Sequence, residues 1–316
     1  MQVFRQLSDV PQDFGPSIVS VGNFDGIHRA HRQMLDQIVS RATKQGAKSV
    51  AVTFSPHPAR YLRPDSSLKL LTPEAEKLRL FASTGLNAVL LLPFDETLRM
   101  TSAYDFAQTI LRDTLHTQEI HEGFNFRFGN KGAGDIRTLT ELGQGFGFEV
   151  FSYPEMRQRG LNVSSSAIRN LLQEGQPHRA RHLLGRAFSI LSSPSRGRGY
   201  GSQYTVPTIN LAPYDELIPQ NGVYITQTRV GSDCFDSVTN IGNRPTFGAD
   251  SFAIETHLLN FHPIDLRADT EIEVFFLRRL RGEIRFSSPE ALREQIGQDV
   301  KKAARYLRLA ARKSKR

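Results

Sequence analysis

Residues 18–31 read Ile-Val-Ser-Val-Gly-Asn-Phe-Asp-Gly-Ile-His-Arg-Ala-His, and this stretch decides the fold of the first half of the chain. A short apolar run ends at a turn that is bounded by Gly22 and Gly26 and delivers His28 and His31. The apolar spacing after the turn predicts an amphipathic helix that stops at a glycine. A strand, a tight turn and a helix N-terminus form a natural phosphate site, because the first-turn N–H groups are unpaired and the dipole favours negative charge there. Histidines at i and i+3 near that end can both face a bound phosphate.

The composition indicates an ordinary globular protein. The chain has 316 residues, enough for two domains, and 39% of them are hydrophobic. The single cysteine, Cys234, cannot form an intramolecular disulfide and fits a reducing compartment. The longest strongly apolar stretch, residues 88–92, is far too short to span a bilayer. With no signal pattern at the N-terminus, we expect a cytoplasmic protein that makes no membrane contact.

The net charge of +8 comes from one end of the chain. Residues 301–316 contain eight Lys or Arg and no acidic residue, whereas residues 1–300 balance 32 basic against 32 acidic side chains. A basic run at the end of a chain is usually a solvated helix face or a frayed terminus. The distribution therefore argues against a nucleic-acid partner.

The first half of the chain alternates predicted strands and helices. Ser102, followed three residues later by Asp105, predicts a helix that runs to about Leu115. This alternation predicts an α/β fold with a doubly wound parallel sheet, whose ligand crevice lies at the carboxyl ends of the strands. We expect strands in residues 18–21, 50–54, 88–92, 120–128 and 148–151.

The second half of the chain has a different residue pattern. Short β-branched or aromatic segments, separated by Pro, Gly, Asn or Asp, predict a small antiparallel β-barrel. We expect its strands in residues 223–230, 236–241, 252–261 and 271–277. A closing helix starts at Ser288-Pro289 and has one apolar stripe for docking on the barrel, formed by Leu292, Ile296, Val300, Ala303 and Leu307. The predicted domains are residues 1–185 and 186–316.

Two further segments of the first half have the chemistry of a nucleotide site. Residues 123–129, Gly-Phe-Asn-Phe-Arg-Phe-Gly, offer aromatic rings on which a flat ligand can stack and the amide of Asn125. The alternative for these rings is a strand that buries them in a core. Residues 163–169 start a helix with Ser164 and Ser165 and place Arg169 one turn later, as in a clamp for phosphate oxygens. The alternative for these serines is a simple helix cap.

The stretch 22–31 resembles the His-x-Gly-His signature of the nucleotidylyltransferase superfamily, which transfers AMP from ATP to a phosphate. In its longer form, Gly-Asn-Phe-Asp-Gly-x-His, it is similar to the bacterial FAD synthetases, although Ala30 stands where that family usually has Gly. Residues 163–169 resemble the superfamily's Ile-Ser-Ser-Thr-x-Ile-Arg signature. The resemblance implies catalysis by His28 and His31, and flavin contacts from Pro58, Phe126 and Phe128. It implies that ATP and its phosphates are bound by Gly22, Asn23, Phe24, His28, His31, Asn125, Ser164, Ser165 and Arg169.

The second half resembles the riboflavin kinases. Residues 207–210, Pro-Thr-Ile-Asn, are similar to the Pro-Thr-Ala-Asn motif of that family, and residues 221–224, 240–247, 255–259 and 279–283 match its later motifs in order. The resemblance implies that Thr208 and Asn210 hold the magnesium and the phosphates and that Glu255 is the catalytic base. It also assigns phosphate contacts to a glycine-rich loop, through Arg196, Gly199 and Gly201. The sequence departs from the family at Thr205 (usually Gly), Ile209 (Ala) and Asn260 (often Asp).

Together the two resemblances cover nearly the whole chain. The chain is therefore similar to the bacterial bifunctional riboflavin kinases and FAD synthetases. They imply that the barrel phosphorylates riboflavin with ATP and Mg2+ to give FMN. The first domain then joins AMP from a second ATP to FMN, which gives FAD and pyrophosphate. Riboflavin's hydroxyl is a poor nucleophile and needs a base. The phosphate of FMN is already an anion, so adenylyl transfer needs alignment and charge stabilisation instead.

Two alternatives remain at the level of the sequence. The first is a nucleotidylyltransferase for another phosphate acceptor with a degenerate second domain, against which Phe126, Phe128 and an intact Glu255 argue. The second is a basic-tailed nucleic-acid binder, which the neutral body of the chain disfavours. The expected partners are small-molecule flavins and ATP. The sequence leaves open whether the protein forms a weak homo-oligomer.

Overall fold

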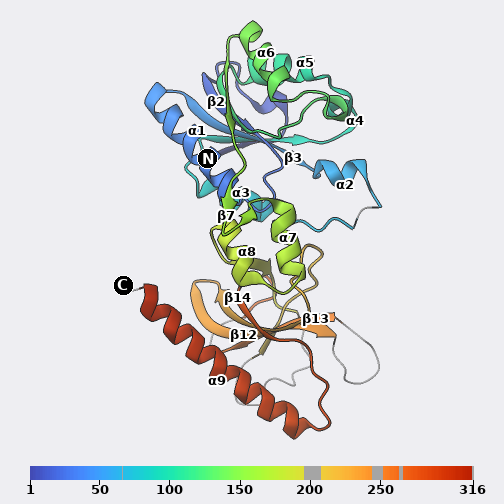
Figure 1. The fold of residues 1–316 in the computed structure, drawn as a ribbon, viewed down its shortest axis with the longest axis vertical. Coiled ribbons are helices and arrows are strands. Elements are labelled where there is room, and N and C mark those ends of the chain that lie inside the picture. The colour runs from blue at the N-terminus through green and yellow to red at the C-terminus, as the bar shows by residue number, and fades with distance from the viewer. Residues whose placement is uncertain (66, 196–207, 244–251, 263–265, 315–316) are drawn as a thin grey trace. The chain divides into compact units, whose positions relative to one another are not determined.

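The computed structural model of the chain describes residues 1–65, 67–195, 208–243, 252–262 and 266–314. The chain divides into two compact units, residues 1–165 and residues 166–316 (Figure 1). Each unit has its own sheet. The domain boundary expected from the sequence, between residues 185 and 186, lies further along the chain and stays a prediction.

The first unit is built on a six-stranded sheet in the order β1–β4–β3–β2–β5–β6, in which all neighbours are parallel. The predicted doubly wound α/β sheet is therefore confirmed. The strands are β1 (Gln2–Phe4), β2 (Ser17–Val21), β3 (Lys48–Ser55), β4 (Ala88–Pro93), β5 (Thr117–Gly123) and β6 (Glu149–Tyr153).

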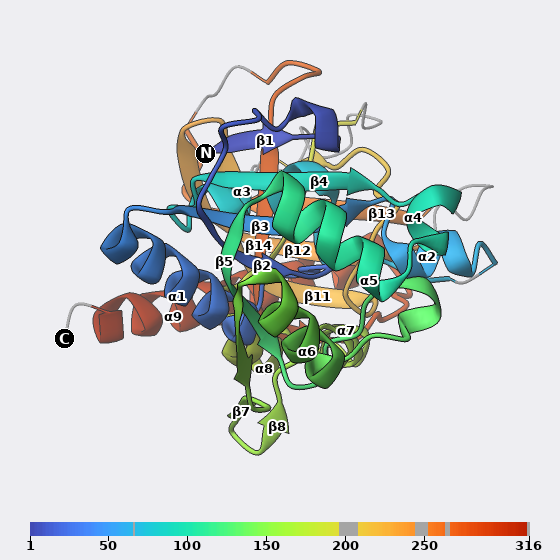
Figure 2. The ribbon, with the colours of Figure 1, turned by 90° about the horizontal axis from the view of Figure 1, so that it is seen from above.

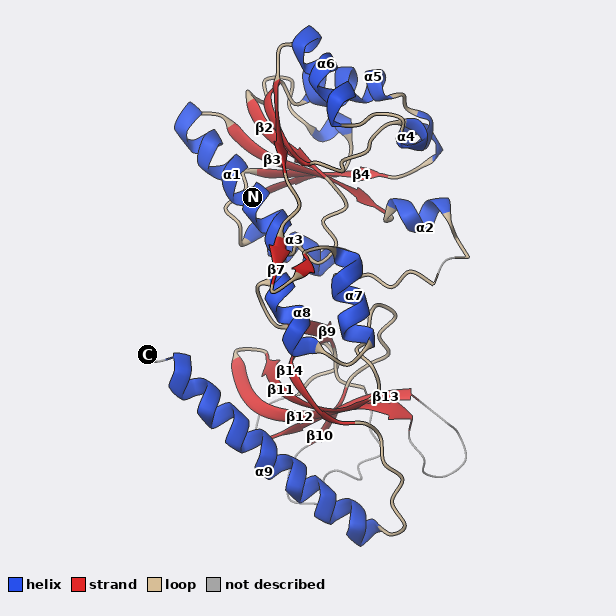
Figure 3. Ribbon diagram, viewed as in Figure 1, coloured by secondary structure: helices blue, strands red, loops and turns tan. Residues whose placement is uncertain are grey.

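The central strands are buried on both faces, which is why they read as continuous apolar runs. Along β2, Ile18 belongs to one core cluster with residues of α1 (Arg29–Gln45) and α3 (Glu74–Ala82). Val19 and Val21 belong to a second cluster with η2 (Phe106–Thr114) and α6 (Ile136–Phe146). The alternation of side chains along each strand thus places helices on both faces of the sheet (Figure 3).

The helix ends follow the sequence signals. Gly46 ends α1 in the left-handed conformation, with φ of 67°. The Ser102 hydroxyl accepts a hydrogen bond from the Asp105 amide (3.0 Å) and caps α5 (Ala103–Asp105), as predicted. The helix then continues as the π-helix η2, which the sequence did not predict. The other short elements are η1 (Leu7–Asp9), α2 (Pro58–Leu62), α4 (Glu96–Met100), η3 (Asn130–Gly132) and the β7 (Arg157–Gln158)–β8 (Leu161–Asn162) hairpin, which forms a two-stranded sheet of its own (Figure 2).

The sheet has a topological switch point between β2 and β5. From β2 the chain adds β3 and β4 on one side and then crosses over to β5 and β6 on the other. The β2–β5 pairing covers only Ser17–Val19, so the carboxyl ends of the two strands separate. Open α/β sheets bind ligands at such a point. The turn after β2 and the aromatic segment after β5, both singled out in the sequence, therefore lie at the same edge of the sheet.

The second unit contains a curled antiparallel sheet in the order β10–β13–β12–β11–β14–β9. The chain beyond β9 pairs with the end of β10, through hydrogen bonds from Ser195 N to Asn210 O and from Ala212 N to Ser193 O (both 2.8 Å). These contacts close the predicted barrel. The strands are β9 (Phe188–Ser192), β10 (Thr208–Asn210), β11 (Gly222–Val230), β12 (Asp233–Asn243), β13 (Phe252–Leu258) and β14 (Ile272–Arg281), and the helices are α7 (Ser165–Gln173), α8 (Pro177–Leu184) and α9 (Pro289–Ser314).

One face of this sheet buries a cluster of hydroxyl groups. Thr226, Ser237, Thr228, Thr256 and Thr239 are fully buried and form a closed ring of hydrogen bonds, 2.8–3.0 Å long. In such a ring each hydroxyl donates once and accepts once, so burial leaves no group unsatisfied. The ring joins the three central strands β11, β12 and β13 to one another.

The closing helix α9 docks along only part of the predicted stripe. Val300, Ala303 and Leu307 pack on the sheet in one core cluster. Leu292 and Ile296 are 41% and 42% exposed, so the prediction is wrong for these two residues. A helix of this length is about 39 Å long, and its contacts with this core cluster come from its middle, between Val300 and Leu307.

Candidate active sites of the two units

The turn after β2 is held in a strained backbone conformation. Phe24 and Ile27 have positive φ values of 48° and 35°, and Gly26 has φ of 85°. Bulky residues rarely adopt such angles, and this kind of strain is concentrated at functional sites. The Phe24 side chain is only 1% exposed and packs against Phe81, so only the backbone of Phe24 is available to a ligand. Gly22 continues the strand through its N–H, which donates to Val52 O (2.9 Å).

The two histidines of the turn lie against each other. Their rings are stacked with centroids 3.7 Å apart and an angle of 14° between their planes. His28 also caps α1, because its Nδ1 accepts a hydrogen bond from the His31 amide (3.4 Å). The rings of His31 and Phe24 are in an edge-on contact, with their centroids 5.1 Å apart. Burial, His28 and Lys77 together hold the pKa of His31 well below its usual value. Ala30 lies inside α1, where the change from glycine causes no strain.

Residues far along the chain hold this turn in place, and the sequence analysis missed them. Asp25 is buried, and its carboxylate accepts hydrogen bonds from the amides of Leu71 (2.9 Å) and Thr72 (3.1 Å). The Thr72 hydroxyl in turn accepts from the Gly26 amide (3.1 Å). No local signal marks these partners. Asp25 was visible inside the quoted stretch, although nothing in the sequence showed what it binds.

The second predicted phosphate segment reaches the same turn. The Ser165 hydroxyl, at the start of α7, donates to the backbone oxygen of Asp25 (2.8 Å). This bond brings Ser165, and Ser164 beside it, to the turn that contains His28. Arg169 lies one helical turn further along α7, within the second unit.

The aromatic segment after β5 lines an open hollow of about 320 Å3. Asn125 and Phe126 belong to its wall, together with Arg127 and residues 135–137 at the start of α6. Phe126 and Phe128 are stacked, with centroids 5.5 Å apart and an angle of 11° between their planes. Phe128 is only 6% exposed and belongs to the core, whereas Phe126 is half-buried. Pro58 lies elsewhere, as the first residue of α2 after β3.

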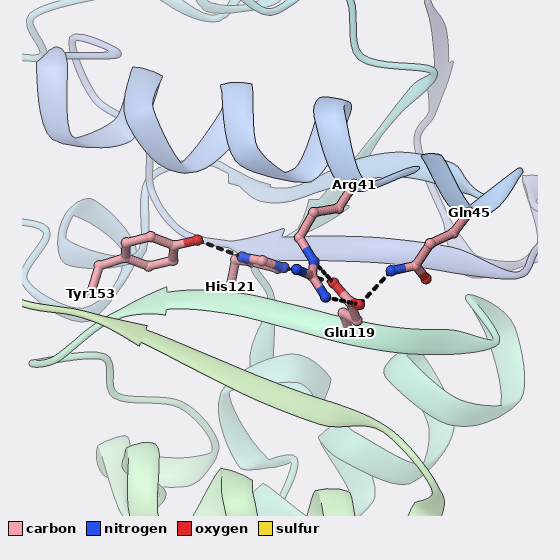
Figure 4. A network of polar contacts seen from close by, with 5 residues as sticks. All are labelled: Arg41, Gln45, Glu119, His121 and Tyr153. Carbon is pink, nitrogen blue, oxygen red and sulfur yellow. Dashed lines mark hydrogen bonds and ion pairs between the residues drawn. The ribbon is translucent and has the colours of Figure 1, made fainter. Parts of the chain in front are cut away.

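A polar network around the buried Glu119 and His121 of β5 fixes α1 to this strand. Glu119 accepts hydrogen bonds from Arg41, from Gln45 (2.6 Å) and from His121 Nε2 (3.1 Å), as Figure 4 shows. Because a carboxylate only accepts, His121 donates from Nε2, and its Nδ1 accepts from the Tyr153 hydroxyl (2.7 Å). The Arg41 hydrogen bond holds the pKa of Glu119 down to about 2. Burial lowers the pKa of His121.

A second buried carboxyl lies at the switch point itself. Glu122 is 2% exposed, and its Oε1 accepts a hydrogen bond from the Val21 amide. This amide lies beyond the last residue of β2 that pairs with β5, so the Glu122 side chain replaces a missing strand contact. Burial raises the pKa of Glu122 well above its usual value.

In the second unit, the predicted kinase residues lie on one face of neighbouring strands. Glu255 is directly opposite Asn210 of β10 and directly opposite Asn240 of β12. Thr208 is opposite His257, and its hydroxyl is 3.2 Å from His257 Nδ1. Side chains that face each other across strands have Cβ atoms about 4.5–5.5 Å apart. The barrel thus brings Thr208, Asn210 and Glu255 together, and the sequence analysis gave no role to His257.

These side chains suit a magnesium ion bound together with phosphates. Hydroxyl, amide and carboxylate oxygens are the ligands that Mg2+ takes, and it commonly uses one or two protein groups plus nucleotide phosphates. In the described part of the chain, no cluster of three or more His, Cys, Asp and Glu side chains is placed to hold a metal by itself. The predicted phosphate residues Arg196, Gly199 and Gly201, and the departure at Thr205, lie outside the described residues. The departure Asn260 has φ of 53°, a conformation that asparagine tolerates.

A later motif of the second unit needs its glycine. Gly222 opens β11 with φ of 147°, and a Cβ atom there would lie 2.4 Å from the backbone oxygen of Arg281. Only glycine allows this approach of two strands. The Nε of Arg281 donates a hydrogen bond to the carboxylate of Asp299 in α9, which is buried (2.9 Å). The motif of residues 279–283 therefore joins β11, β14 and the closing helix.

Comparison with known proteins identifies relatives of both units. The FAD synthetase family matches residues 10–167, and the riboflavin kinase family matches residues 184–307. A bifunctional riboflavin kinase/FMN adenylyltransferase of Pseudomonas fluorescens is 35% identical over 97% of this chain and 98% of its own length. The protein of the same name from Escherichia coli strain K12 is 31% identical over 96% of each chain. A solved structure described as a macrolide-efflux protein from Streptococcus pneumoniae has the same fold, with a TM-score of 0.84, 24% identity and coverage of 95% of this chain and 97% of its own.

Proposed function

The chain belongs to the family of bifunctional riboflavin kinase/FMN adenylyltransferases, and we propose that each of its two compact units carries one of the two reactions. The protein phosphorylates riboflavin to FMN and joins FMN to AMP to give FAD. In our proposal, adenylyl transfer takes place at the switch point of the first unit. Riboflavin phosphorylation takes place on the strand face that contains Glu255.

Adenylyl transfer needs hydrogen-bond donors to the phosphates and no base. The phosphate oxygen of FMN attacks the α-phosphorus of ATP, and the bond to the departing pyrophosphate breaks. The stacked His28 and His31 at the start of α1 supply imidazole donors at the helix N-terminus, where the helix dipole favours negative charge. Ser165 hydrogen-bonds to the turn and adds a hydroxyl at the same place. We assign the isoalloxazine contact to Phe126 in the wall of the hollow.

Phosphorylation of riboflavin needs a base for its hydroxyl proton. The single observation that supports the second site best is the position of Glu255 in register between Asn210 and Asn240. In our proposal Glu255 accepts the proton of the riboflavin hydroxyl while the hydroxyl oxygen attacks the γ-phosphorus of ATP and the bond from this phosphorus to the departing ADP breaks. Thr208 and Asn210 would hold Mg2+, which neutralises phosphate charge when bound.

The partners we propose are flavins and ATP. No helix in the described part of the chain is long and apolar enough to cross a bilayer. We propose a cytoplasmic location because Cys234 is the chain's single cysteine, which fits a reducing compartment.

The two assignments predict opposite losses of product. We expect Glu255→Gln to reduce FMN formation from riboflavin by roughly 10²–10⁴-fold and to leave conversion of supplied FMN to FAD unchanged. We expect His28→Asn to reduce FAD formation by about 10²–10³-fold, so that FMN accumulates. Asparagine preserves the helix cap, so this variant removes the imidazole without removing the cap.

The measurement is the rate of both products with riboflavin, ATP and Mg2+, resolved by chromatography. Glu294→Gln, at an exposed position of α9, is the matched control for the carboxylate. His116→Asn, at an exposed position of the first unit, is the control for the imidazole. Undiminished FMN formation by Glu255→Gln would remove Glu255 from the mechanism. Normal FAD formation by His28→Asn would show that His28 is a helix cap and nothing more.

A further inference from the structure

One lysine in the first unit is buried beside the turn that contains the two histidines. Lys77, in the first turn of α3, is only 4% exposed, and its ammonium donates a hydrogen bond to the backbone oxygen of Asn23 (3.1 Å). An isolated buried ammonium is costly, so such a residue needs a physical reason. Burial lowers the pKa of Lys77, and the nearby carboxylates of Asp25 and Glu74 raise it. These carboxylates keep a positive charge in place next to the turn.

The contact of Lys77 acts on the strained part of the turn. Asn23 immediately precedes Phe24, whose φ is 48°, and the same backbone oxygen is 3.4 Å from the Thr53 hydroxyl. The two donors come from β3 and α3, which flank the turn. They fix the direction of the Asn23 carbonyl and therefore the path by which the chain reaches His28.

The charge of Lys77 acts on His31. The Nδ1 atom of His31 is buried and has no hydrogen-bond partner among the described residues. The charged and titratable groups around this ring are His28 on its own helix and Lys77 on α3, and both disfavour a charged imidazole. The carboxylate of Asp25, in the same turn, is bound to the amides of Leu71 and Thr72. A proton on Nδ1 would be buried without an acceptor, so the neutral ring has its proton on Nε2.

We propose that Lys77 is a positioning residue for adenylyl transfer: its hydrogen bond to Asn23 fixes the turn, and its charge acts together with burial and His28 to favour a neutral His31 with its one proton on Nε2. This inference rests on the proposed contact of His31 with the phosphates. A neutral imidazole donates a hydrogen bond to a phosphate oxygen and keeps its proton while the phosphorus–oxygen bonds form and break. His31 then stabilises charge throughout the reaction and does not act as a general acid.

Two substitutions separate charge from shape. Lys77→Met keeps a flexible apolar stem and removes the ammonium, so it removes both the Asn23 contact and the charge. Lys77→Arg keeps the charge. Lys44→Met, at an exposed position of α1, is the matched control for loss of a lysine.

The test is the 15N NMR spectrum of the imidazole groups of the full chain between pH 5 and 8, in which His31 is assigned from the signal lost in His31→Gln. We expect the neutral Nε2–H form at pH 7 in the wild type, in Lys44→Met and in Lys77→Arg. In Lys77→Met we expect the titration of His31 to move to higher pH than in the wild type. The acid limb of kcat/KM for FMN adenylylation should move with it, with riboflavin phosphorylation unchanged.

A charged His31 at pH 7 in the wild type overturns the proposal. So does a folded Lys77→Met variant in which the titration of His31 stays where it is in the wild type. If Lys77→Met does not fold, the wild-type and Lys77→Arg spectra decide, because both must show the neutral Nε2–H form. Normal FAD formation by His31→Gln would contradict the phosphate contact of His31 and leave the NMR result standing, so the two failures are distinguishable.

Discussion

The aromatic side chains around the first site have two different surroundings. Phe128 is buried in the core, 5.8 Å from the ring of Phe106, and Phe126 lies half-exposed in the wall of the hollow. The sequence pattern left open whether these rings form a ligand wall or a core. In the structure the segment does both, because the two rings are stacked on each other and only Phe128 lies inside the core.

This division predicts different losses for two similar substitutions. Phe128→Ala should lower the free energy of unfolding by about 3–5 kcal/mol, because it leaves a cavity in a packed core. Phe126→Ala should lower it by less and should raise the KM for FMN, because its exposed face is the one we assign to the flavin. Urea denaturation and FMN-dependent kinetics of both variants provide the check. A larger loss of stability in Phe126→Ala than in Phe128→Ala would contradict the assignment.

Single residues also show where sequence reasoning stops. His28 and His31 were identifiable because a strand, a turn and a helix start follow one another within a few residues. Lys77 and Thr72 were not, because their contacts with Asn23, Asp25 and Gly26 join segments about fifty residues apart. Only the fold of the sheet brings these segments together, and no local pattern encodes that approach.

The network of Arg41 and Glu119 decides how α1 is attached to the sheet. It binds the C-terminal half of the helix to β5, and the Arg41 guanidinium also lies 4.5 Å from the centre of the Phe151 ring. A helix that is fixed at one end by a partly buried ion pair has a defined direction at the other. The other end of α1 is the one that presents His28 and His31 to the switch point.

This attachment should depend on pH. The folded-state pKa of Glu119 is about 2, below its usual 4.5, so its stabilisation is fully present above pH 4.5 and is lost as the pH falls toward 2. The lowered pKa of His121 acts in the same direction, because a base that is buried neutral loses stability as the pH falls below 6.5. We expect the free energy of unfolding to fall by roughly 2–3 kcal/mol between pH 5 and 2 through Glu119.

Urea denaturation of wild type and Glu119→Gln across this range measures the effect. The variant should be less stable at pH 7 and should show a shallower fall below pH 4.5. Glu141→Gln is the matched control, because Glu141 forms an exposed ion pair with Arg137 that contributes little. Parallel pH curves for wild type and Glu119→Gln would show that Glu119 titrates normally in the folded protein.

Among the helices and strands, those with a strong local pattern were predictable. The strand–turn–helix unit at residues 17–45 and the four long barrel strands follow apolar periodicity and turn residues. The π-helical hydrogen bonding of η2 was not predictable, since it changes no residue spacing that a sequence pattern can detect. The exposed Leu292 and Ile296 show a second limit. An apolar stripe predicts which face of a helix packs, but the size of the sheet surface under the helix decides how much of that face is covered.

The two units have cores of different kinds. The first unit buries branched aliphatic side chains on both faces of a parallel sheet, whereas the barrel of the second contains a ring of five hydroxyl groups. Each of the three core clusters seen among the described residues lies within one unit. The division into two reactions thus coincides with a division into two sets of packing contacts.

This independence predicts that the second unit works alone, and the structure indicates where to cut. Helix α8 packs on β14 and β9 and buries Ala180, Leu183 and Leu184. A fragment of residues 166–316 keeps this helix, whereas residues 186–316, the domain expected from the sequence, lose it.

We expect both fragments to fold and to convert riboflavin to FMN with no FAD. The longer one should have the higher thermal midpoint, because burial of a leucine side chain stabilises by about 1.5–3 kcal/mol. Thermal unfolding and FMN formation by each fragment test this. If neither fragment phosphorylates riboflavin under conditions where the full chain does, the kinase site depends on the first unit, and equal midpoints would show that α8 is not part of the barrel's stabilising core.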